Sequence, residues 1–132
     1  MFLLDTHILL WMLYAPEKLS ENEKEIILNN DNRLFVSVVS LWEMTIKYSL
    51  KKLDFKNISP DTILKLSKDS DVDILNLNEV MVTSQYFLPL MSNHKDPFDR
   101  MLIWQCISNK MILISRDKKF EAYKEFGLQL LN

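Results

Sequence analysis

Glycine, cysteine and histidine are nearly absent from this 132-residue chain. Its one glycine, Gly127, stands near the C-terminus, so the chain has no glycine-rich loop that could bring backbone amides close to a phosphate. A single cysteine, Cys106, excludes an intrachain disulfide and a multi-cysteine zinc site. Two histidines, His7 and His94, are too few for a histidine-rich metal centre. Any catalytic chemistry must therefore depend mainly on carboxylates.

Long apolar runs are absent as well, and none approaches the ~20 residues that a transmembrane helix needs. The apolar start Phe2–Leu4 lacks the basic residues and cleavage site of a signal peptide, and Asp5 interrupts it. We therefore expect a cytoplasmic protein with no membrane partner. The formal net charge of −2 argues against broad, nonspecific attraction to nucleic acid, but it is compatible with a nuclease.

The distribution of apolar and polar residues predicts that strands and helices alternate along the whole chain. Strands are expected at 2–4, 33–37, 72–75, 111–115 and 128–131, and helices at 7–14, 20–30, 39–50, 59–69, 78–87, 96–109 and 118–126. Ser20, with Glu23 three residues later, forms a capping-box pattern at one helix start. This order predicts one α/β domain over residues 1–132, a three-layer sandwich with a central parallel sheet between helices.

Four acidic residues stand where a parallel sheet would gather them. Asp5 follows the first strand, and Asp117 lies two residues past the strand at 111–115. Glu43 is expected in the first turn of the helix after the second strand, and Asp99 in the first turn of the helix before the fourth. Ligands of open parallel sheets bind beyond the carboxyl ends of the strands. The pattern therefore predicts that these four carboxylates meet at that edge.

Each of these acids also has a purely structural explanation. Asp5, Asp96 and Asp117 can cap the helices that follow them, and Ser40 with Glu43 fits a second capping box. Serine or asparagine suffices for capping at other helix starts, so the consistent use of carboxylates at this edge favours a cation site. Clustered carboxylates repel one another unless a cation neutralises them. Hard oxygen ligands suit Mg²⁺ or Mn²⁺ rather than zinc.

Segments spread over the chain resemble the motifs of PIN-domain toxins of the VapC type. In chain order they are FLLDTHILLW at 2–11, SVVSLWE at 37–43, HKDPFDRMLIWQ at 94–105 and LISRDKKF at 113–120. The acids of these motifs are Asp5, Glu43, Asp99 and Asp117. The motifs follow the family's order and the chain has the family's length, so the resemblance covers essentially the whole protein.

This resemblance implies the PIN three-layer sandwich and endonucleolytic cleavage of RNA with Mg²⁺ or Mn²⁺. Asp5, Asp99 and Asp117 would bind the metal, and Glu43 would bind it directly or through water. The protein would be the toxin of a type II toxin–antitoxin pair, held inactive by a protein antitoxin. The resemblance also favours a homodimer.

Several further polar residues stand beside the four acids. Hydroxyl groups that could orient carboxylates are those of Thr6, Ser40 and Ser115, with helix capping equally open for Ser40. Arg100 is the candidate for a phosphate contact, because a guanidinium binds phosphate oxygens in bidentate fashion. An ion pair between Arg100 and Asp96, or another acid at this edge, is the equal alternative. His94 is expected in a surface loop, and the alternative is a contact with RNA or a role in proton transfer.

The competing function is a noncatalytic PIN-like module that binds RNA or protein. Such a module would have lost one or more of the acids, whereas all four are present. Two other folds with carboxylates at strand ends fit poorly. A phosphoacceptor receiver domain would need adjacent acids after the first strand, where Asp5 is followed by Thr6. An aspartate-nucleophile phosphatase would need a second acid two residues on, where His7 stands.

Overall fold

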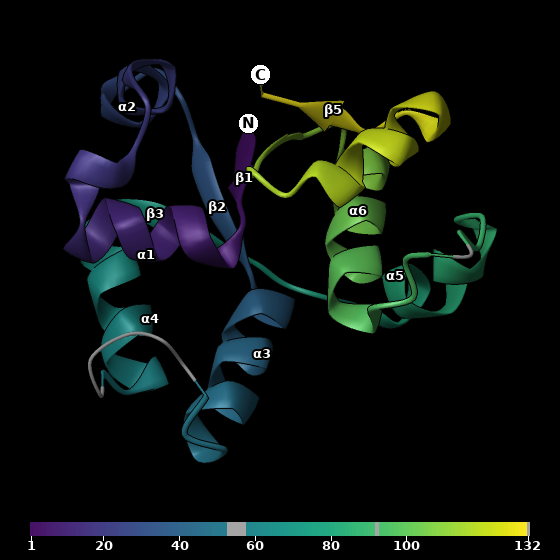
Figure 1. Ribbon diagram of the computed structural model, residues 1–132, viewed down its shortest axis with the longest axis horizontal. Helices are drawn as coiled ribbons and strands as arrows, with labels where there is room; N and C mark the ends of the chain where they lie inside the picture. The colour runs from purple at the N-terminus through teal and green to yellow at the C-terminus, as the bar shows by residue number, and fades with distance from the viewer. Residues whose placement is uncertain (53–57, 92, 132) are drawn as a thin grey trace.

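A parallel sheet lies between two layers of helices (Figure 1). The computed structural model describes residues 1–52, 58–91 and 93–131. Within these ranges the sheet has five strands, all parallel, in the order β3-β2-β1-β4-β5. Their bounds are β1 Phe2–Leu4, β2 Leu34–Ser37, β3 Val72–Leu75, β4 Ile112–Ile114 and β5 Gln129–Leu130. The predicted α/β sandwich is therefore confirmed.

Helices connect the strands and cover both faces of the sheet. In the described ranges they are α1 Thr6–Tyr14, α2 Glu21–Leu28, α3 Val38–Ser49, α4 Pro60–Asp69, α5 Glu79–Ser84 and α6 Pro97–Asn109. Shorter 3-10 segments are η1 Pro16–Lys18, η2 Gln85–Phe87 and η3 Lys118–Phe126. No helix in the described parts of the chain is both long and apolar enough to cross a membrane.

The sheet divides the apolar interior into two cores, because successive strand residues point to opposite faces. Leu4 and Val36 face a core that is completed by residues of α1, α2 and α4. Leu3 and Leu113 face the other core, which is completed by α6 and η3. A sheet buried on both faces explains why β1 and β4 consist only of apolar residues.

Several helices differ in bounds or type from those predicted. Helix α3 begins at Val38 because the Ser37 hydroxyl accepts a hydrogen bond from the Val39 amide at 3.0 Å. The predicted capping box of Ser40 and Glu43 is therefore wrong, and Glu43 lies in the second turn of the helix. The predicted capping box of Ser20 and Glu23 is confirmed. The predicted helix at 78–87 divides into α5 and η2, and the last predicted helix is the 3-10 segment η3.

The order of the strands creates an opening at one edge of the sheet. The chain places β2 and β3 on one side of β1, and β4 and β5 on the other. Connections from β1 and β4 therefore diverge at the carboxyl ends of these neighbouring strands, which is the usual position of a ligand site. In Figure 1 the two chain ends lie at the opposite edge, away from the starts of α1, α3 and α6.

A carboxylate-lined cleft as candidate active site

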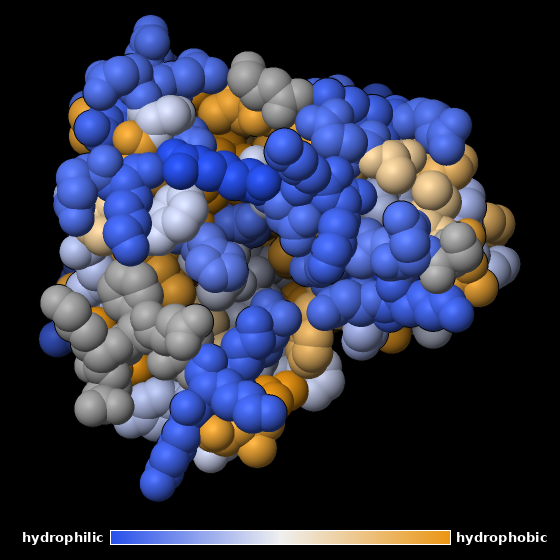
Figure 2. Space-filling model, in the orientation of Figure 1, coloured by the Kyte–Doolittle hydropathy of each residue, from blue (hydrophilic) through white to orange (hydrophobic). Residues whose placement is uncertain are grey.

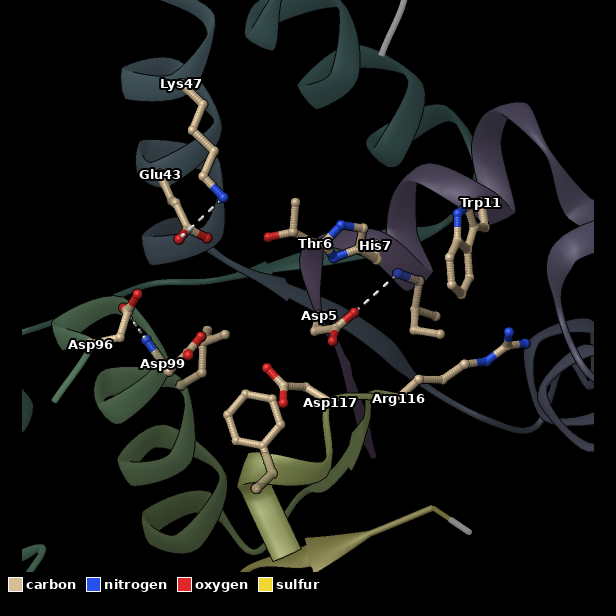
Figure 3. A pocket seen from close by; sticks show the side chains of 13 residues that line it. Asp5, Thr6, His7, Trp11, Glu43, Lys47, Asp96, Asp99, Arg116 and Asp117 are labelled. Atoms are coloured by element: carbon tan, nitrogen blue, oxygen red, sulfur yellow. Dashed lines mark hydrogen bonds and ion pairs between the residues drawn. The ribbon is translucent and has the colours of Figure 1, made fainter. Parts of the chain in front are cut away.

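A cleft of about 380 Å³ lies at the carboxyl ends of β1 and β4 (Figure 3). Its walls include all four predicted acids, namely Asp5, Glu43, Asp99 and Asp117. Asp96, Lys47, Arg116, His7 and Trp11 also line it. Residues more than a hundred positions apart in the sequence thus meet at the edge where the sheet topology places a ligand. In the orientation of Figure 1, hydrophilic side chains dominate the visible face of the molecule (Figure 2).

Asp5 directly follows β1 and caps α1. Its Oδ1 accepts a hydrogen bond from the Ile8 amide at 3.0 Å, so the capping role proposed as an alternative is present as well as the place in the cleft. The residue is only 9% exposed. Burial raises the pKa of the Asp5 carboxyl, and hydrogen bonds from the Ser115 hydroxyl and the Ile8 amide oppose this rise only in part.

Ser115 connects two of the acids. Its hydroxyl hydrogen-bonds to Asp5 and accepts a hydrogen bond from the Asp117 amide at 3.1 Å. Asp117 itself is exposed and caps η3 by accepting from the Lys119 amide at 3.0 Å. Ser115 therefore contacts both Asp5 and the backbone of Asp117, and its predicted role in orienting carboxylates stays a prediction. Thr6 also lies in the cleft wall.

Glu43 reaches the cleft from the second turn of α3. Burial raises the pKa of its carboxyl, Lys47 opposes the rise, and the nearby negative charges of Asp96 and Asp99 add to it. The Lys47 Nζ lies 3.7 Å from Glu43 Oε2 across one helical turn. Lys47 was not among the predicted site residues, although its spacing of four residues from Glu43 is the signal that could have revealed it.

Asp99 lies in the first turn of α6, beside the capping residue Asp96. Burial raises the pKa of the Asp99 carboxyl; a hydrogen bond with His94 opposes the rise, and the charge of Asp96 adds to it. His94 is 4% exposed, so the expectation of a surface-loop histidine is wrong. No sequence pattern indicated this contact, because His94 lies outside the helix and its ring is placed by tertiary packing on Phe120 and Tyr123.

Arg100 lies outside the cleft, contrary to its predicted role as a phosphate contact. Its side chain is 5% exposed. Nη1 donates to the Pro89 carbonyl at 2.9 Å and Nη2 to the Leu88 carbonyl at 2.8 Å. The guanidinium therefore holds the segment that leads into α6, and the alternative ion pair with Asp96 is not formed either. Both predictions failed because the guanidinium donates its hydrogen bonds to backbone carbonyls of the preceding segment. No sequence motif indicates such hydrogen bonds.

Ser40 likewise lies outside the cleft wall. It is 1% exposed, and its hydroxyl has no hydrogen-bond partner within the part of the chain that the structure describes. It contacts none of the four acids through a hydrogen bond among those residues. Its predicted role in orienting a carboxylate is therefore not supported by its position.

The chemistry of the cleft fits a hard divalent cation. Burial or neighbouring negative charge raises the pKa of Asp5, Glu43 and Asp99, so their ionised forms are costly unless positive charge compensates them. Within the described residues, however, no three Asp, Glu, His or Cys side chains converge closely enough to form a ready-made metal cage. The four acids thus line one cleft without a preformed cage, and their oxygen donors suit Mg²⁺ or Mn²⁺.

The sequence profile of the PIN domain matches residues 2–125. The chain belongs to the PIN domain family. No curated protein sequence matches it. Among solved structures it is similar to VapBC2 from Rickettsia felis bound to a promoter DNA fragment, with a TM-score of 0.68, 19% identity and coverage of 99% of this chain and 97% of that chain. It is also similar to FitAcB from Neisseria gonorrhoeae, with a TM-score of 0.65, 16% identity and coverage of 100% and 97%. These likenesses show that this PIN domain has the same fold.

The raised pKa of Asp5 predicts an unusual effect of pH on stability. Because the folded-state pKa lies above the usual 3.8, the folded protein retains a proton that the unfolded chain releases. Stability is therefore lost as the pH rises from below 3.8 through the raised folded value. Asp5→Asn keeps an acceptor for the Ile8 amide and removes the charge. In chelator, we expect this variant to melt at a higher temperature than wild type at pH 7, with a difference that shrinks towards pH 3.8.

Differential scanning fluorimetry across this pH range checks the expectation. Asp73→Asn is the matched control, because Asp73 is exposed on the edge strand β3 and pairs with Arg33 at 3.1 Å. It should show no such pH-dependent gain. A lower melting temperature for Asp5→Asn than for wild type at pH 7, without metal, would contradict the electrostatic account of the cleft.

Proposed function

We propose that this PIN-domain protein is a divalent-metal-dependent endoribonuclease that hydrolyses RNA phosphodiester bonds. The observation that carries the proposal is the convergence of Asp5, Glu43, Asp99 and Asp117 on one cleft at the switch point of a parallel sheet. Structural capping alone requires one polar residue per helix start. Glu43 caps no helix, so capping does not explain why it lines the same cleft as the other three acids.

Asp5, Asp99 and Asp117 would hold Mg²⁺ or Mn²⁺, with Glu43 bound directly or through water. Such a cation, when bound, supplies Lewis-acid polarisation of a phosphate oxygen and of a water molecule. The chain's own contribution is to orient the carboxylates. Ser115 holds Asp5 and the Asp117 backbone at a defined spacing. Burial of Asp5 and partial burial of Glu43 and Asp99 reduce the screening of their charges by water.

Two cations line the otherwise acidic cleft and are the candidates for contacts with RNA phosphates. Lys47 and Arg116 have side chains that are 45% and 44% exposed. Arg116 is held in place by Glu23, whose Oε1 it contacts at 2.6 Å, and its guanidinium lies 4.7 Å from the centre of the Trp11 ring. We therefore propose Lys47 and Arg116, instead of Arg100, as the phosphate contacts, because the Arg100 guanidinium donates to the carbonyls of Leu88 and Pro89.

Cleavage of a mixed set of structured RNAs tests the proposal. Wild type, Asp5→Asn and Asp99→Asn are compared with Mg²⁺, with Mn²⁺ and with chelator, after circular dichroism has confirmed folding. We expect wild type to cleave RNA in a metal-dependent way. In both variants the cleavage rate should fall by more than about 100-fold, which exceeds the loss typical when a residue that only hydrogen-bonds to a metal ligand is replaced. Asp73→Asn, on the distant edge strand, should cleave as wild type does.

Absence of cleavage under every condition, together with no rise in melting temperature on adding Mg²⁺ or Mn²⁺, would contradict the proposal. That outcome would favour the noncatalytic PIN-like module that binds RNA or protein. Metal-independent cleavage that survives in Asp5→Asn and Asp99→Asn would instead place the nuclease activity elsewhere.

The partner that we propose is a protein antitoxin in a type II toxin–antitoxin pair. This proposal is supported by the fold shared with the VapBC and FitAB structures, of which VapBC2 is described as bound to DNA from its promoter. A small DNA-binding protein encoded beside this chain should form a complex with it and suppress RNA cleavage. Undiminished cleavage in a stable complex would count against the pairing.

We further propose a homodimer, supported by large apolar side chains that are exposed on α3, α5 and η2 and just after η2. They are Trp42, Val80, Val82, Tyr86, Phe87 and Leu90. Exposed apolar side chains of this size are candidates for burial on association. Sedimentation velocity should show a dimer for wild type and a monomer for Tyr86→Glu. A wild-type protein that stays monomeric at high concentration would refute this assembly.

A further inference from the structure

His94 is a buried histidine that contacts a cleft carboxylate from behind. Its Nε2 lies 3.0 Å from Asp99 Oδ2, and the residue is 4% exposed. The imidazole ring packs against Phe120 and Tyr123, with ring centroids 5.9 and 5.4 Å away. Its backbone amide donates to the Met91 carbonyl at 3.1 Å. Both the backbone and the ring of His94 are thus held in place.

The surroundings of the ring determine the direction of this hydrogen bond. An ionised carboxylate can only accept, so the hydrogen must lie on His94 Nε2. Nδ1 is buried and has no partner among the residues that the structure describes. A hydrogen on Nδ1 would be a buried, unsatisfied donor, which costs more than a bare lone pair on a weakly polar ring nitrogen. The favoured tautomer therefore carries its hydrogen on Nε2 and points it at Asp99.

We propose that His94 is a positioning residue for Asp99. Rotation of a carboxylate about its last bond is a broad, soft torsion, so a free Asp99 would sample many orientations. The bond from His94 engages Oδ2 and leaves Oδ1 for the cleft that Asp99 lines. The inference rests on the proposed function, because an orientation matters only if this carboxylate holds a cation.

The same side chain also connects two of the segments that carry the acids. Phe120 and Tyr123, which hold the His94 ring, belong to η3, and η3 begins directly after Asp117. Asp99 is carried by α6. His94 therefore joins the helix that carries one acid to the segment that carries another, so that their spacing does not depend on the carboxylates themselves, which repel each other.

If the role of His94 were purely structural, any side chain that fills the same volume in the core would replace it. The two roles are separated by substituting His94 with and without a donor. His94→Gln can place an amide donor close to the position of Nε2, whereas His94→Leu fills space and removes the donor. His94→Phe, which keeps ring contacts with Phe120 and Tyr123, replaces His94→Leu if the latter does not fold. Circular dichroism and thermal melting establish which variants are folded.

Binding of Mn²⁺, measured by calorimetry on each folded variant, is the first readout. We expect the Kd for Mn²⁺ to rise about 10- to 100-fold in the variant without a donor, as is typical when a partner of a metal ligand is removed. His94→Gln should recover most of this affinity. In RNA cleavage, kcat should fall in the variant without a donor, with the KM for RNA unchanged. Equal behaviour of the Gln and Leu or Phe variants would overturn the positioning role.

A second readout needs neither metal nor activity. Long-range ¹H–¹⁵N spectra of the metal-free wild-type protein should show a hydrogen on His94 Nε2. A hydrogen on Nδ1 with none on Nε2 would overturn the inference directly. If wild type binds Mn²⁺ and cleaves RNA while loss of the donor changes neither, the positioning role fails and the proposed function stands. If wild type shows neither binding nor cleavage, both fail.

Discussion

The site depends on carboxylates that are partly buried at the carboxyl ends of β1 and β4. Asp5 and Asp99 are placed there by elements that are themselves well packed, so neither can simply move away from the other. Burial raises the pKa of both; the charge of Asp99 adds to the rise at Asp5, and the charges of Asp96 and Asp117 add to the rise at Asp99. Without a cation, the ionised carboxylates therefore destabilise the folded protein, and a bound divalent cation would relieve this destabilisation. The affinity for a cation would thus depend on the packing that keeps the carboxylates in place.

The scaffold tolerates this cost because each acid also makes a favourable local interaction. Asp5 and Asp117 cap the elements that follow them, and Glu43 pairs with Lys47. Capping bonds satisfy backbone amides that would otherwise lack partners. Structural and proposed catalytic roles are therefore combined in the same residues rather than being alternatives. The Ser115 hydroxyl hydrogen-bonds to Asp5, and the buried His94 ring hydrogen-bonds to Asp99.

Much of this site follows from the sequence because the acids stand at boundaries of strongly apolar elements. Asp5 and Asp117 follow unmistakable strands, and a parallel sheet places both at one edge. The failures have different causes. Ser37 rather than Ser40 caps α3, and two serines three residues apart fit equally well until the strand end is known. Arg100 and His94 depend on the non-periodic segment between η2 and α6, whose carbonyls and bend no local pattern specifies.

The central claim is that the cleft acids hold a divalent cation, and locating Mn²⁺ by its anomalous scattering in crystals tests it most directly. The account predicts a peak in the cleft between Asp5 and Asp99, in direct contact with carboxylate oxygens of both. The same peak should vanish in Asp5→Asn crystals soaked under identical conditions. Saturating Mn²⁺ that gives no peak in the cleft, or peaks only at surface carboxylates elsewhere, would contradict the account.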